Sequence, residues 1–578
     1  MTDYKSLKKS AKEARDRAGL KDISFALLGD TATQFLKTAI EGYGAMLSYR
    51  ADVYESEYDV IDSEVLDENS GLYESARDIV IIYMSPQKAY ESFTALEMPK
   101  RRGFAEEYAG RIRGYWDTLK ERTSSAIIQF GMNGINGHVM GDFANRQEDS
   151  FEFQLEKLKY LMMCEAAKRE GVYLLDLDRI ERILGRDVFT DMRFYYDARM
   201  AISTEALPYV AKGVYDIALA IKGQIKKCVI FDLDNTIWGG VIGDDLLSGI
   251  ELGELGDGRI YSDIQRYLLE LKKRGIILAV CSKNDEETAK EPFLEHPDMI
   301  LGLDDIAVFV ANWEDKASNI RYIQETLNIG MDSMVFLDDN PFERELVREM
   351  TEDITVPELP EQKAEWLNYL SDLNLFEVAS YSEGSDRTRQ YREESLRRSE
   401  QKKYSSIDDY LKSLDMEAEC ASFDEFRFPR IAELSQRSNQ FNLRTVRYTE
   451  DEIRRIAESD GYLTRYYSLK DRFGDHGLIS AVIIKKTKDD EGFIDTWFMS
   501  CRVLKRGMEE FIINDIVASC KEAGIRKLVG EYLATKKNGM VEHIYADMGF
   551  DDLGEGRYAV DCGTFTKRKT YIRSSLRP

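Results

Sequence analysis

Between residues 20 and 380, short apolar runs alternate with longer amphipathic stretches. Short apolar runs predict buried strands, and amphipathic stretches predict helices. Their alternation indicates parallel sheets that are covered by helices. The first series of predicted strands lies at 23–28, 79–84, 125–130 and 173–178, and the second at 226–234, 275–283, 306–312 and 331–339.

The pattern changes after residue 380. Residues 380–404 are highly charged and almost free of large aliphatic side chains, which predicts a solvated linker or an exposed helix. Beyond this segment, strand-like and helical stretches follow one another in a different order. Predicted helices lie at 428–443 and 508–524, and predicted strands at 462–471, 478–486, 492–504 and 527–533.

These patterns predict an α/β chain of three domains, for which 578 residues are sufficient. The predicted parts are an N-terminal helix over residues 1–20, a first domain over 21–206, a connecting helix over 207–225, a second domain over 226–378, a linker over 379–404 and a third domain over 405–578.

The charge balance narrows the classes of partner. The chain has 79 Lys and Arg residues against 105 Asp and Glu residues, a formal net charge of −26. An acidic surface disfavours binding to duplex nucleic acid and to anionic membranes. The N-terminus is charged, and no apolar run approaches the length of a membrane span. We therefore expect a cytoplasmic protein with no nucleic-acid or membrane partner.

The cysteines and histidines argue against two kinds of structural site. The chain has 7 cysteines and 4 histidines, which are scattered and include no CxxC pair. A structural zinc site needs closely spaced ligands, and a disulfide framework needs paired cysteines. Neither is predicted.

The stretch CVIFDLDNT, residues 228–236, carries the strongest chemical signal. Its apolar part predicts a buried strand, and Asp232 and Asp234 follow at the carboxyl end, where ligands bind in open α/β sheets. Two carboxylates this close repel each other unless a cation or a shared proton compensates them. Mg²⁺ prefers oxygen ligands and keeps phosphate in its shell. With the charge balanced, one aspartate can attack phosphorus and the other can protonate the leaving oxygen.

Three later features supply the other groups that such a reaction needs. Ser282 follows a predicted strand and offers a hydroxyl to a phosphoryl oxygen. Lys316, in NWEDKASNI, offers an ammonium that neutralises charge on an aspartyl phosphate. Asp338 and Asp339 end the last predicted strand and offer further Mg²⁺ ligands.

The motifs DLDNT, CSK, EDKASNI and FLDD resemble, in this order, the four motifs of the haloacid dehalogenase (HAD) phosphatase superfamily. The resemblance implies a Rossmann-like parallel sheet. It makes Asp232 the nucleophile and a metal ligand, and Asp234 the general acid and base whose backbone carbonyl also reaches the metal. The remaining residues that it implies are two phosphoryl-binding groups, Ser282 and Lys316, and two further metal ligands, Asp338 and Asp339. Which of the last two binds the metal directly stays open.

Longer strings are more specific. FDLDNTIWGGVIGDD, LAVCSKND, FLDDNPFERE and PRIAELSQRSNQFNLRTVRYTEDEI resemble the FkbH-like proteins, HAD subfamily IIIC, over residues 20–578. Family members in polyketide pathways take a glyceryl group from 1,3-bisphosphoglycerate and load it on an acyl carrier protein. The resemblance implies a phosphorylated substrate of that kind, a carrier protein as partner and Mg²⁺ as cofactor. The segment between DLDNT and CSK is too short for a large cap domain, so the site should be open.

In that family a cysteine is thought to carry the glyceryl thioester, and Cys281 is the candidate because it directly precedes Ser282. A thiolate is a good acyl acceptor, and Lys316 and Mg²⁺ could lower the pKa of this thiol. The alternative is that Cys281 is a small apolar residue at the end of a buried strand.

Three further residues are candidates for substrate contact. Gly239 and Gly240, in WGGVIGDD, could present backbone N–H groups to the substrate, or could simply make a tight turn. Lys283 could contact a second phosphate, or could be ordinary surface charge.

The first domain begins FALLGDTATQF, which resembles the first block of SGNH-type hydrolases with Thr31 in place of the serine. Asn133 or Asn136 could point to such a site. A hydrolase of this type also needs an Asp and His pair late in the domain. Asp191 has no histidine near it in the sequence, and His138 is the only histidine of the domain. A threonine without a base is a poor nucleophile. We therefore expect a degenerate SGNH fold that binds or scaffolds.

The last domain resembles the GNAT acyltransferases, which implies a mixed α/β fold. Arg506 and Gly507 precede a helix where the family binds the coenzyme A pyrophosphate, and Asn538 and Tyr545 match its late Asn and Tyr positions. Glu509 departs from the pattern, because a carboxylate beside a pyrophosphate weakens binding. The domain is expected to dock acyl-CoA or a phosphopantetheine arm, or to have lost catalysis.

Together these observations predict an Mg²⁺-dependent HAD-type phosphohydrolase or phosphotransferase, coupled to transfer of a glyceryl-type acyl group to an acyl carrier protein or a small acceptor. Two alternatives remain. One is a plain cytosolic HAD phosphatase with accessory binding domains. The other is a non-catalytic assembly factor that senses a phosphorylated ligand.

Overall fold

The computed structural model describes residues 2–135, 139–378, 397, 400, 404, 406–438, 441–488, 490–500, 503–535 and 538–575, except for the side chains at 437 and 488. Within these ranges the chain forms three sheets. The prediction of an α/β chain with two parallel sheets and one mixed sheet is confirmed.

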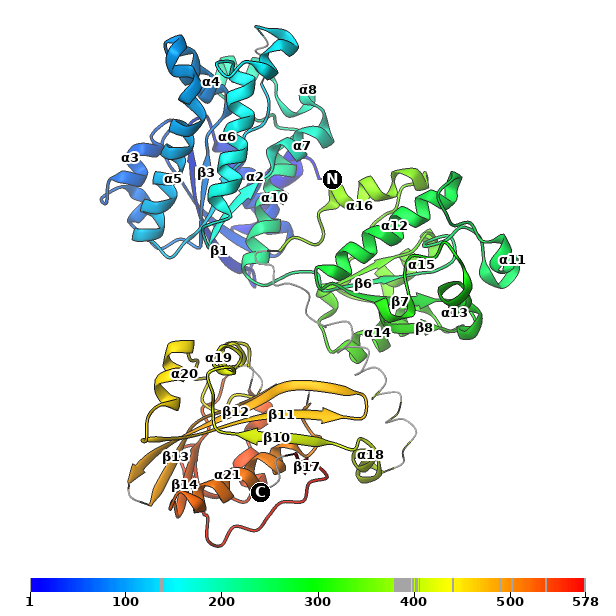
Figure 1. Ribbon diagram of the computed structural model, residues 1–578. Helices are drawn as coiled ribbons and strands as arrows, with labels where there is room; N and C mark the ends of the chain where they lie inside the picture. Colours follow the sequence, from blue (N-terminus) through cyan, green and yellow to red (C-terminus); the bar gives the residue numbers. More distant parts are fainter. Residues whose placement is uncertain are drawn as a thin grey trace. The chain divides into compact units, whose positions relative to one another are not determined.

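The first sheet has five parallel strands in the order β2-β1-β3-β4-β5. They are β1 (Lys21–Gly29), β2 (Tyr49–Glu55), β3 (Ile79–Tyr83), β4 (Ala126–Phe130) and β5 (Val172–Leu175). Alternate residues of β1 face opposite cores, Phe25 and Leu27 on one side and Ala26 and Leu28 on the other. Both faces are therefore covered by helices (Figure 1).

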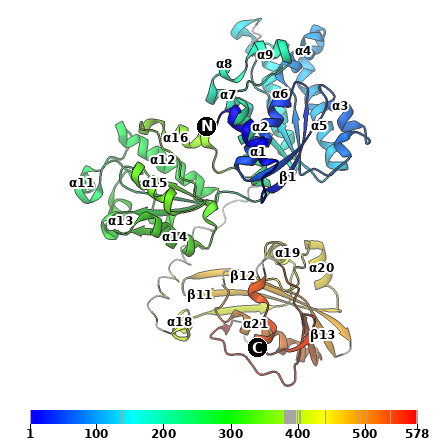
Figure 2. The ribbon, with the colours of Figure 1, turned by 180° about the vertical axis from the view of Figure 1, so that it is seen from behind.

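The helices of this sheet fall into two groups. The first core contains residues of α1 (Tyr4–Ala14), α2 (Gln34–Met46), α7 (Leu177–Leu184) and α10 (Leu207–Ile221). Figure 2 shows α1, α2 and α7 from behind. The second core contains residues of α3 (Ile61–Leu66), α4 (Pro86–Ala95), α5 (Phe104–Arg122) and α6 (Phe151–Ala166). Two short helices, α8 (Arg186–Phe189) and α9 (Met192–Ala198), follow α7.

Two helices that the sequence pattern set apart from the first domain belong to its core. In α10, the expected connecting helix, Val210, Val214 and Tyr215 are fully buried against the sheet. The N-terminal helix α1 buries Leu7, whose backbone lies so close to Gly42 of α2 that any side chain there would clash. Burial of these apolar faces makes both helices part of the first domain.

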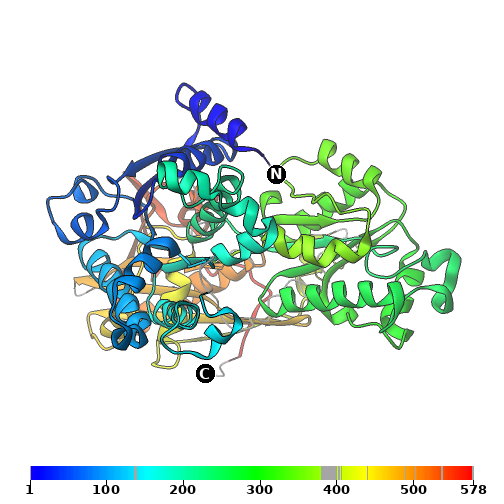
Figure 3. The same ribbon diagram turned by 90° about the horizontal axis from the view of Figure 1, so that it is seen from above.

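The second sheet has four strands in the order β8-β7-β6-β9. They are β6 (Cys228–Phe231), β7 (Ile277–Ser282), β8 (Ile306–Ala311) and β9 (Met334–Leu337). The associated helices are α11 (Ile242–Gly249), α12 (Gly256–Lys273), α13 (Glu286–Glu295), α14 (Lys316–Leu327), α15 (Pro341–Met350) and α16 (Trp366–Leu373). The segment from β6 to β7 holds two helices and no strand, as expected for a minimal cap, and these helices are green in Figure 3.

The third sheet has eight strands in the order β15-β16-β14-β13-β12-β11-β10-β17. They are β10 (Glu417–Ala421), β11 (Tyr462–Asp471), β12 (Gly474–Lys488), β13 (Glu491–Met499), β14 (Lys527–Glu531), β15 (Asp551–Gly554), β16 (Arg557–Asp561) and β17 (Arg573–Ser574). Its helices are α18 (Ile407–Ser413), α19 (Phe428–Arg437), α20 (Glu450–Ala457), α21 (Met508–Glu522) and α22 (Ile544–Asp547). Residues of α21 pack in one core, and residues of α19 and α20 pack in another.

Most of the predicted linker lies outside the described residues, but Arg397 is described and is buried in the third domain. Its guanidinium donates to both carboxylate oxygens of Asp471, at 2.6 and 2.9 Å. A buried ion pair of this geometry is costly to break, because one charge would then stay buried alone. At this position the segment is an integral part of the third domain.

Candidate active site

The parallel pairing of β6 and β9 brings two of the predicted aspartates together. In this register Phe231 lies opposite Leu337, the last residues of the two strands. Asp232 and Asp338 come next, and the backbone N–H of Asp232 donates to the carbonyl of Leu337 at 3.0 Å. Both side chains are buried, with 7% and 0% of the residue exposed.

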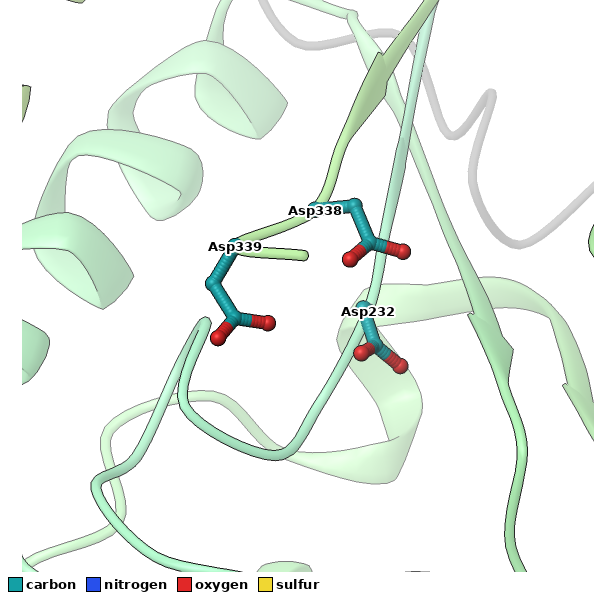
Figure 4. A group of neighbouring side chains, drawn as sticks. All are labelled: Asp232, Asp338 and Asp339. Atoms are coloured by element: carbon teal, nitrogen blue, oxygen red, sulfur yellow. The ribbon is translucent and has the colours of Figure 1, made fainter. Parts of the chain in front are cut away.

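Asp339 completes a group of three carboxylates. One oxygen from each of Asp232, Asp338 and Asp339 lies within 4.8 Å of the other two (Figure 4). Like charges at this separation are unfavourable unless a cation balances them. Three oxygen donors at this spacing fit a hard divalent cation such as Mg²⁺. The predicted metal ligands Asp232, Asp338 and Asp339 thus converge.

A hydroxyl links the two loops that carry these carboxylates. Thr236 follows β6, and its Oγ1 accepts a hydrogen bond from the backbone N–H of Asp339 at 3.1 Å. The same hydroxyl lies 3.5 Å from the Asp339 carboxylate. The loop after β9 is also held internally, because the N–H of Asn340 donates to Asp338 at 2.9 Å.

Arg344 supports the second loop from α15. Its Nη1 donates to the backbone carbonyls of Asp338 at 2.9 Å and of Asp339 at 2.7 Å, and its Nη2 pairs with Glu358. The guanidinium is buried and fixes the loop through main-chain atoms. Sequence reasoning missed both Thr236 and Arg344. Thr236 belongs to the DLDNT motif and Arg344 to the string FLDDNPFERE, so both lay inside marked segments, but neither string shows which main-chain atoms these side chains bind.

Asp234 lies apart from the carboxylate group. Its Oδ1 accepts hydrogen bonds from the indole of Trp238 at 2.9 Å and from the backbone N–H of Ile242 at 3.0 Å. These contacts orient its side chain within its own loop, which suits a separate role in proton transfer. A metal contact through the Asp234 carbonyl stays a prediction.

The two predicted substrate-loop glycines make a tight turn. Gly239 forms two backbone hydrogen bonds with Glu251, at 3.1 and 2.9 Å. Gly240 has φ of +88°, and a Cβ there would lie 2.7 Å from a carboxylate oxygen of Asp245. A Cβ at Gly239 would also lie 2.8 Å from the Tyr261 ring, so close approach at both positions explains glycine without a ligand. A substrate contact by either residue stays a prediction.

The remaining predicted residues of the second domain lie on β7 and α14 and directly after β7. Ser282 ends β7 and Lys316 begins α14, and both are buried. Cys281 is fully buried, and its Sγ faces the backbone carbonyl of Lys316 at 3.8 Å. Lys283 is half-buried. Because side chains alternate along a strand, Cys281 and Ser282 point to opposite faces of the sheet. An acyl group on Cys281 would need a rearrangement of its surroundings.

The chain shares extensive similarity with known proteins. Residues 24–219 match the family described as FkbH, N-terminal domain. The N-terminal part of the protein BF1531 from Bacteroides fragilis, which contains a phosphatase domain complexed with Mg, is 44% identical, with a TM-score of 0.63. This match covers 66% of the present chain and 100% of the solved one. The chain belongs to the FkbH family. The family predicted from the sequence motifs is confirmed.

Other solved structures resemble this FkbH-like protein over a smaller part. The ribosomal-protein-S18-alanine N-acetyltransferase from Escherichia coli is 14% identical, with a TM-score of 0.20, over 25% of this chain and 94% of its own. The GNAT domain of S. lividans PAT is 15% identical, with a TM-score of 0.20, over 25% and 89%. No match was found among curated proteins. Among the described helices, none combines the length and apolarity needed to cross a membrane.

In the third domain of the FkbH-like protein, a side chain of α21 binds the loop that precedes this helix. Gly507 precedes the helix with φ of +83°. Glu509 is buried, and its Oε1 accepts a hydrogen bond from the backbone N–H of Lys505 at 2.9 Å. Burial raises the pKa of Glu509 above its ordinary value. The carboxylate that the sequence marked as a departure therefore binds a backbone amide of this loop.

Arg506 faces a buried polar cluster. Its Nη1 lies 3.7 Å from the Asp471 carboxylate and 3.5 Å from Nε2 of His476. Asp471 also pairs with Arg397 and His476. These hydrogen bonds and cations hold the pKa of Asp471 far below its usual range, even though burial opposes the shift.

The two late residues of the GNAT-like pattern are fully buried. Asn538 donates to the carbonyls of Asn442 and Leu533, each at 3.0 Å. Tyr545 packs among aromatic rings, including the stacked ring of Tyr558. Both residues serve the fold in these contacts, and binding of acyl-CoA or phosphopantetheine by them stays a prediction.

A further segment lies between β13 and β14. These strands pair only over Glu491–Phe493 and Lys527–Val529. Beyond that point, residues 441–443 pair with β13 through Met499 to Phe441 at 3.1 Å and Leu443 to Trp497 at 3.4 Å. Leu533, after β14, donates to the carbonyl of Leu443 at 2.9 Å. The opening between the strands is thus bridged by the chain's own backbone.

Two of the predicted SGNH-like residues of the first domain, Thr31 and Asn133, are buried. Thr31 follows β1 and is buried, and the neighbouring Asp30 accepts from the backbone N–H of Ser85 at 2.9 Å. Burial raises the pKa of Asp30 to about 7. Asn133 donates to Glu181 at 2.9 Å. Asp191 caps α9, while Asn136 and His138 lie outside the described residues. Hydrolase-like binding stays a prediction.

Proposed function

We propose that this FkbH-like protein is a divalent-metal-dependent phosphohydrolase or phosphotransferase that uses Asp232 as its nucleophile. The observation that carries the proposal is the convergence of Asp232, Asp338 and Asp339 at the ends of β6 and β9. Its donor set consists of carboxylate oxygens, which suit Mg²⁺. The Mg complex of the related Bacteroides fragilis phosphatase domain supports the choice of this cation.

In the proposed reaction, an oxygen of Asp232 bonds to phosphorus while the bond from phosphorus to the leaving oxygen breaks. Asp234 gives its proton to the leaving oxygen, and later takes one from the water that hydrolyses the aspartyl phosphate. Ser282 and Lys316 bind the phosphoryl oxygens, as the motifs predict. A bound Mg²⁺ would balance the negative charge of the carboxylates and the phosphate.

We further propose an acyl phosphate of the 1,3-bisphosphoglycerate type as substrate, with an acyl carrier protein or a small molecule as acyl acceptor. Membership of the FkbH family supports this part. The simpler alternative is a phosphatase whose flanking domains only bind. The full burial of Cys281 favours that alternative, because an acyl acceptor must be reached by its donor.

The test is intact-protein mass and phosphate release after incubation with Mg²⁺ and enzymatically generated 1,3-bisphosphoglycerate. Wild type, Asp232→Asn, Cys281→Ala and Cys228→Ala are compared, the last as a buried cysteine of β6 without a proposed role. We expect phosphate release that Asp232→Asn abolishes. A glyceryl adduct that is present in wild type and Cys228→Ala and absent in Cys281→Ala supports the thioester, whereas release without any adduct leaves a plain phosphatase. Phosphate release at the wild-type rate by Asp232→Asn would show that Asp232 is not the nucleophile.

A further inference from the structure

A lysine that no sequence motif marks reaches the loop carrying Asp234. Lys363 belongs to a short 3₁₀ helix (Lys363–Glu365) just before α16. Its Nζ donates to Oδ1 of Asn235 at 3.3 Å and to the hydroxyl of Tyr261 at 2.5 Å. The ammonium also lies 5.1 Å from the centre of the Tyr261 ring and 6.0 Å from that of Trp366.

The partners of Lys363 are all neutral. Among the residues that the structure describes, its close contacts are an amide oxygen, a phenol and two aromatic rings, and none is a carboxylate. A half-buried ammonium loses hydration, and neutral partners compensate this loss only in part. An ordinary surface ion pair therefore does not explain the position of this lysine.

Asn235 is the residue through which Lys363 acts on the loop. Its backbone has φ of +55°, the left-handed conformation, and its N–H donates to the carbonyl of Gly240 at 3.2 Å. Its Oδ1 accepts from the N–H of Gly240, at 3.2 Å, as well as from Lys363. One amide oxygen thus closes the turn from 235 to 240 and receives the lysine.

The same turn fixes the predicted acid. Asp234 directly precedes Asn235, and the indole that donates to its carboxylate comes from Trp238, inside the turn. The second donor is the N–H of Ile242, just beyond it. A shift of Asn235 would move both the aspartate backbone and its two donors.

We propose that Lys363 is a positioning residue for Asp234: by holding the Asn235 amide, it fixes the turn that aims the Asp234 carboxyl at the leaving oxygen. The inference rests on the proposed phosphoryl-transfer function. In this view the site has two separate parts, the metal-binding carboxylates and the turn that holds Asp234. Lys363 belongs to the second part, since it has no described contact with Asp232, Asp338 or Asp339. Loss of Lys363 should impair protonation of the leaving group and leave metal binding unchanged.

The test compares Lys363→Met with wild type on two substrates, phenyl phosphate and p-nitrophenyl phosphate, at varied Mg²⁺. Phenol is a poor leaving group that needs the proton, whereas p-nitrophenol leaves readily without it. Removing general acid assistance costs on the order of 10²-fold or more. We expect kcat to fall by roughly that factor for phenyl phosphate and by less than about 3-fold for p-nitrophenyl phosphate. Lys363→Arg should restore part of the loss.

Two further variants keep the result interpretable. Lys226→Met is the matched control, because Lys226 is also half-buried and donates to a neutral group, the carbonyl of Asp332. It should leave both kcat values unchanged. If Lys363→Met fails to fold, Tyr261→Phe removes one of the two hydrogen-bond acceptors of Lys363 and should reproduce the same substrate dependence in weaker form.

Three outcomes overturn the inference. Equal loss of kcat on both substrates would indicate a general structural effect, a raised Mg²⁺ requirement would place Lys363 with the metal, and unchanged kinetics would give it no role. Asp232→Asn distinguishes this failure from failure of the proposed function. If Asp232→Asn is inactive and Lys363→Met loses both activities equally, only the positioning role is wrong. If Asp232→Asn keeps its activity, the proposed function is wrong, and the positioning role with it.

Discussion

Short motifs predicted binding sites both at the carboxylate group after β6 and β9 and at the start of α21. The two sites differ in whether their polar groups already have partners within the chain. In the first, Asp232, Asp338 and Asp339 converge although their charges repel. In the second, Glu509 accepts from the backbone amide of Lys505 inside the chain. Like charges that lie close together are stabilised by a bound cation, whereas a backbone amide that already has an acceptor gains nothing from a ligand.

The same contrast extends to the neighbouring backbone. Next to α21, residues 441–443 pair with the end of β13 and bridge to the segment after β14. At the carboxylate group, the side chains of Thr236 and Arg344 hold main-chain atoms of Asp338 and Asp339. The carboxylate side chains therefore remain directed toward one another, whereas the region next to α21 is closed by the backbone of residues 441–443.

The largest expected effect comes from the carboxylate group. Asp338→Asn removes one of three charges, and we expect phosphate release at 1 mM Mg²⁺ to fall by roughly 10²-fold or more, because the site loses a metal ligand. Titration of activity with Mg²⁺ checks this. The matched variant Glu509→Gln, in the other region, should keep wild-type phosphate release. An equal loss of phosphate release in Asp338→Asn and Glu509→Gln would contradict the assignment of the metal site to the carboxylate group alone.

A smaller effect is expected from the support of that group. Arg344→Met should raise the Mg²⁺ concentration for half-maximal activity by about 10-fold, since groups that orient metal ligands typically contribute 10- to 100-fold to affinity. The measurement is Mg²⁺-dependent phosphate release at saturating substrate. Arg348→Met, which removes the neighbouring guanidinium that also pairs with Glu358, is the control. A lower kcat at unchanged Mg²⁺ requirement would contradict this role of Arg344.

The third prediction concerns free coenzyme A. A pyrophosphate in the loop before α21 would have to compete with the Glu509 carboxylate, which already accepts from the backbone amide of Lys505. We expect a dissociation constant above about 1 mM, which corresponds to less than about 4 kcal/mol of binding free energy. Isothermal titration calorimetry on the full chain measures it. Micromolar binding would show that the closed region opens.

The smallest effect is on stability. Burial raises the pKa of Glu509, so the folded state holds this proton more tightly than the unfolded chain. Stability from this group is therefore present at acidic pH and falls as the pH rises from the unfolded value of about 4.3 through the folded pKa. Glu509→Gln should remove that fall and raise the Tm at pH 7 relative to wild type. Thermal unfolding between pH 4.5 and 7.5 tests this, with Glu510→Gln as the control.

Strands that are buried along their whole length were predictable. The runs that became β3, β6, β7 and β9 are continuous and apolar because both faces of a parallel sheet are covered. β2 and β10 were missed, because charged residues interrupt YRADVYE and EAECA. β2 is an edge strand of its sheet, and a partly exposed strand has no continuous apolar run to reveal it.

The sequence by itself determined which chemistry the second domain can carry, because Asp232, Asp234, Asp338 and Asp339 directly follow apolar strands and local hydrophobicity dictates where those strands end. Only the tertiary structure decided how these groups are held. Arg344 and Lys363 act on loops from other elements, and Lys363 lies 128 residues from Asn235 along the chain.

The contacts that cover the predicted binding loop of the third domain were likewise set by the tertiary structure. The motif around Arg506 and Gly507 has the residues of a binding loop, yet the Glu509 carboxylate already accepts from the backbone amide of Lys505 in this loop. A local sequence fixes which donors a loop presents, because they lie on its own backbone. Whether those donors stay available depends on segments that only folding brings beside them.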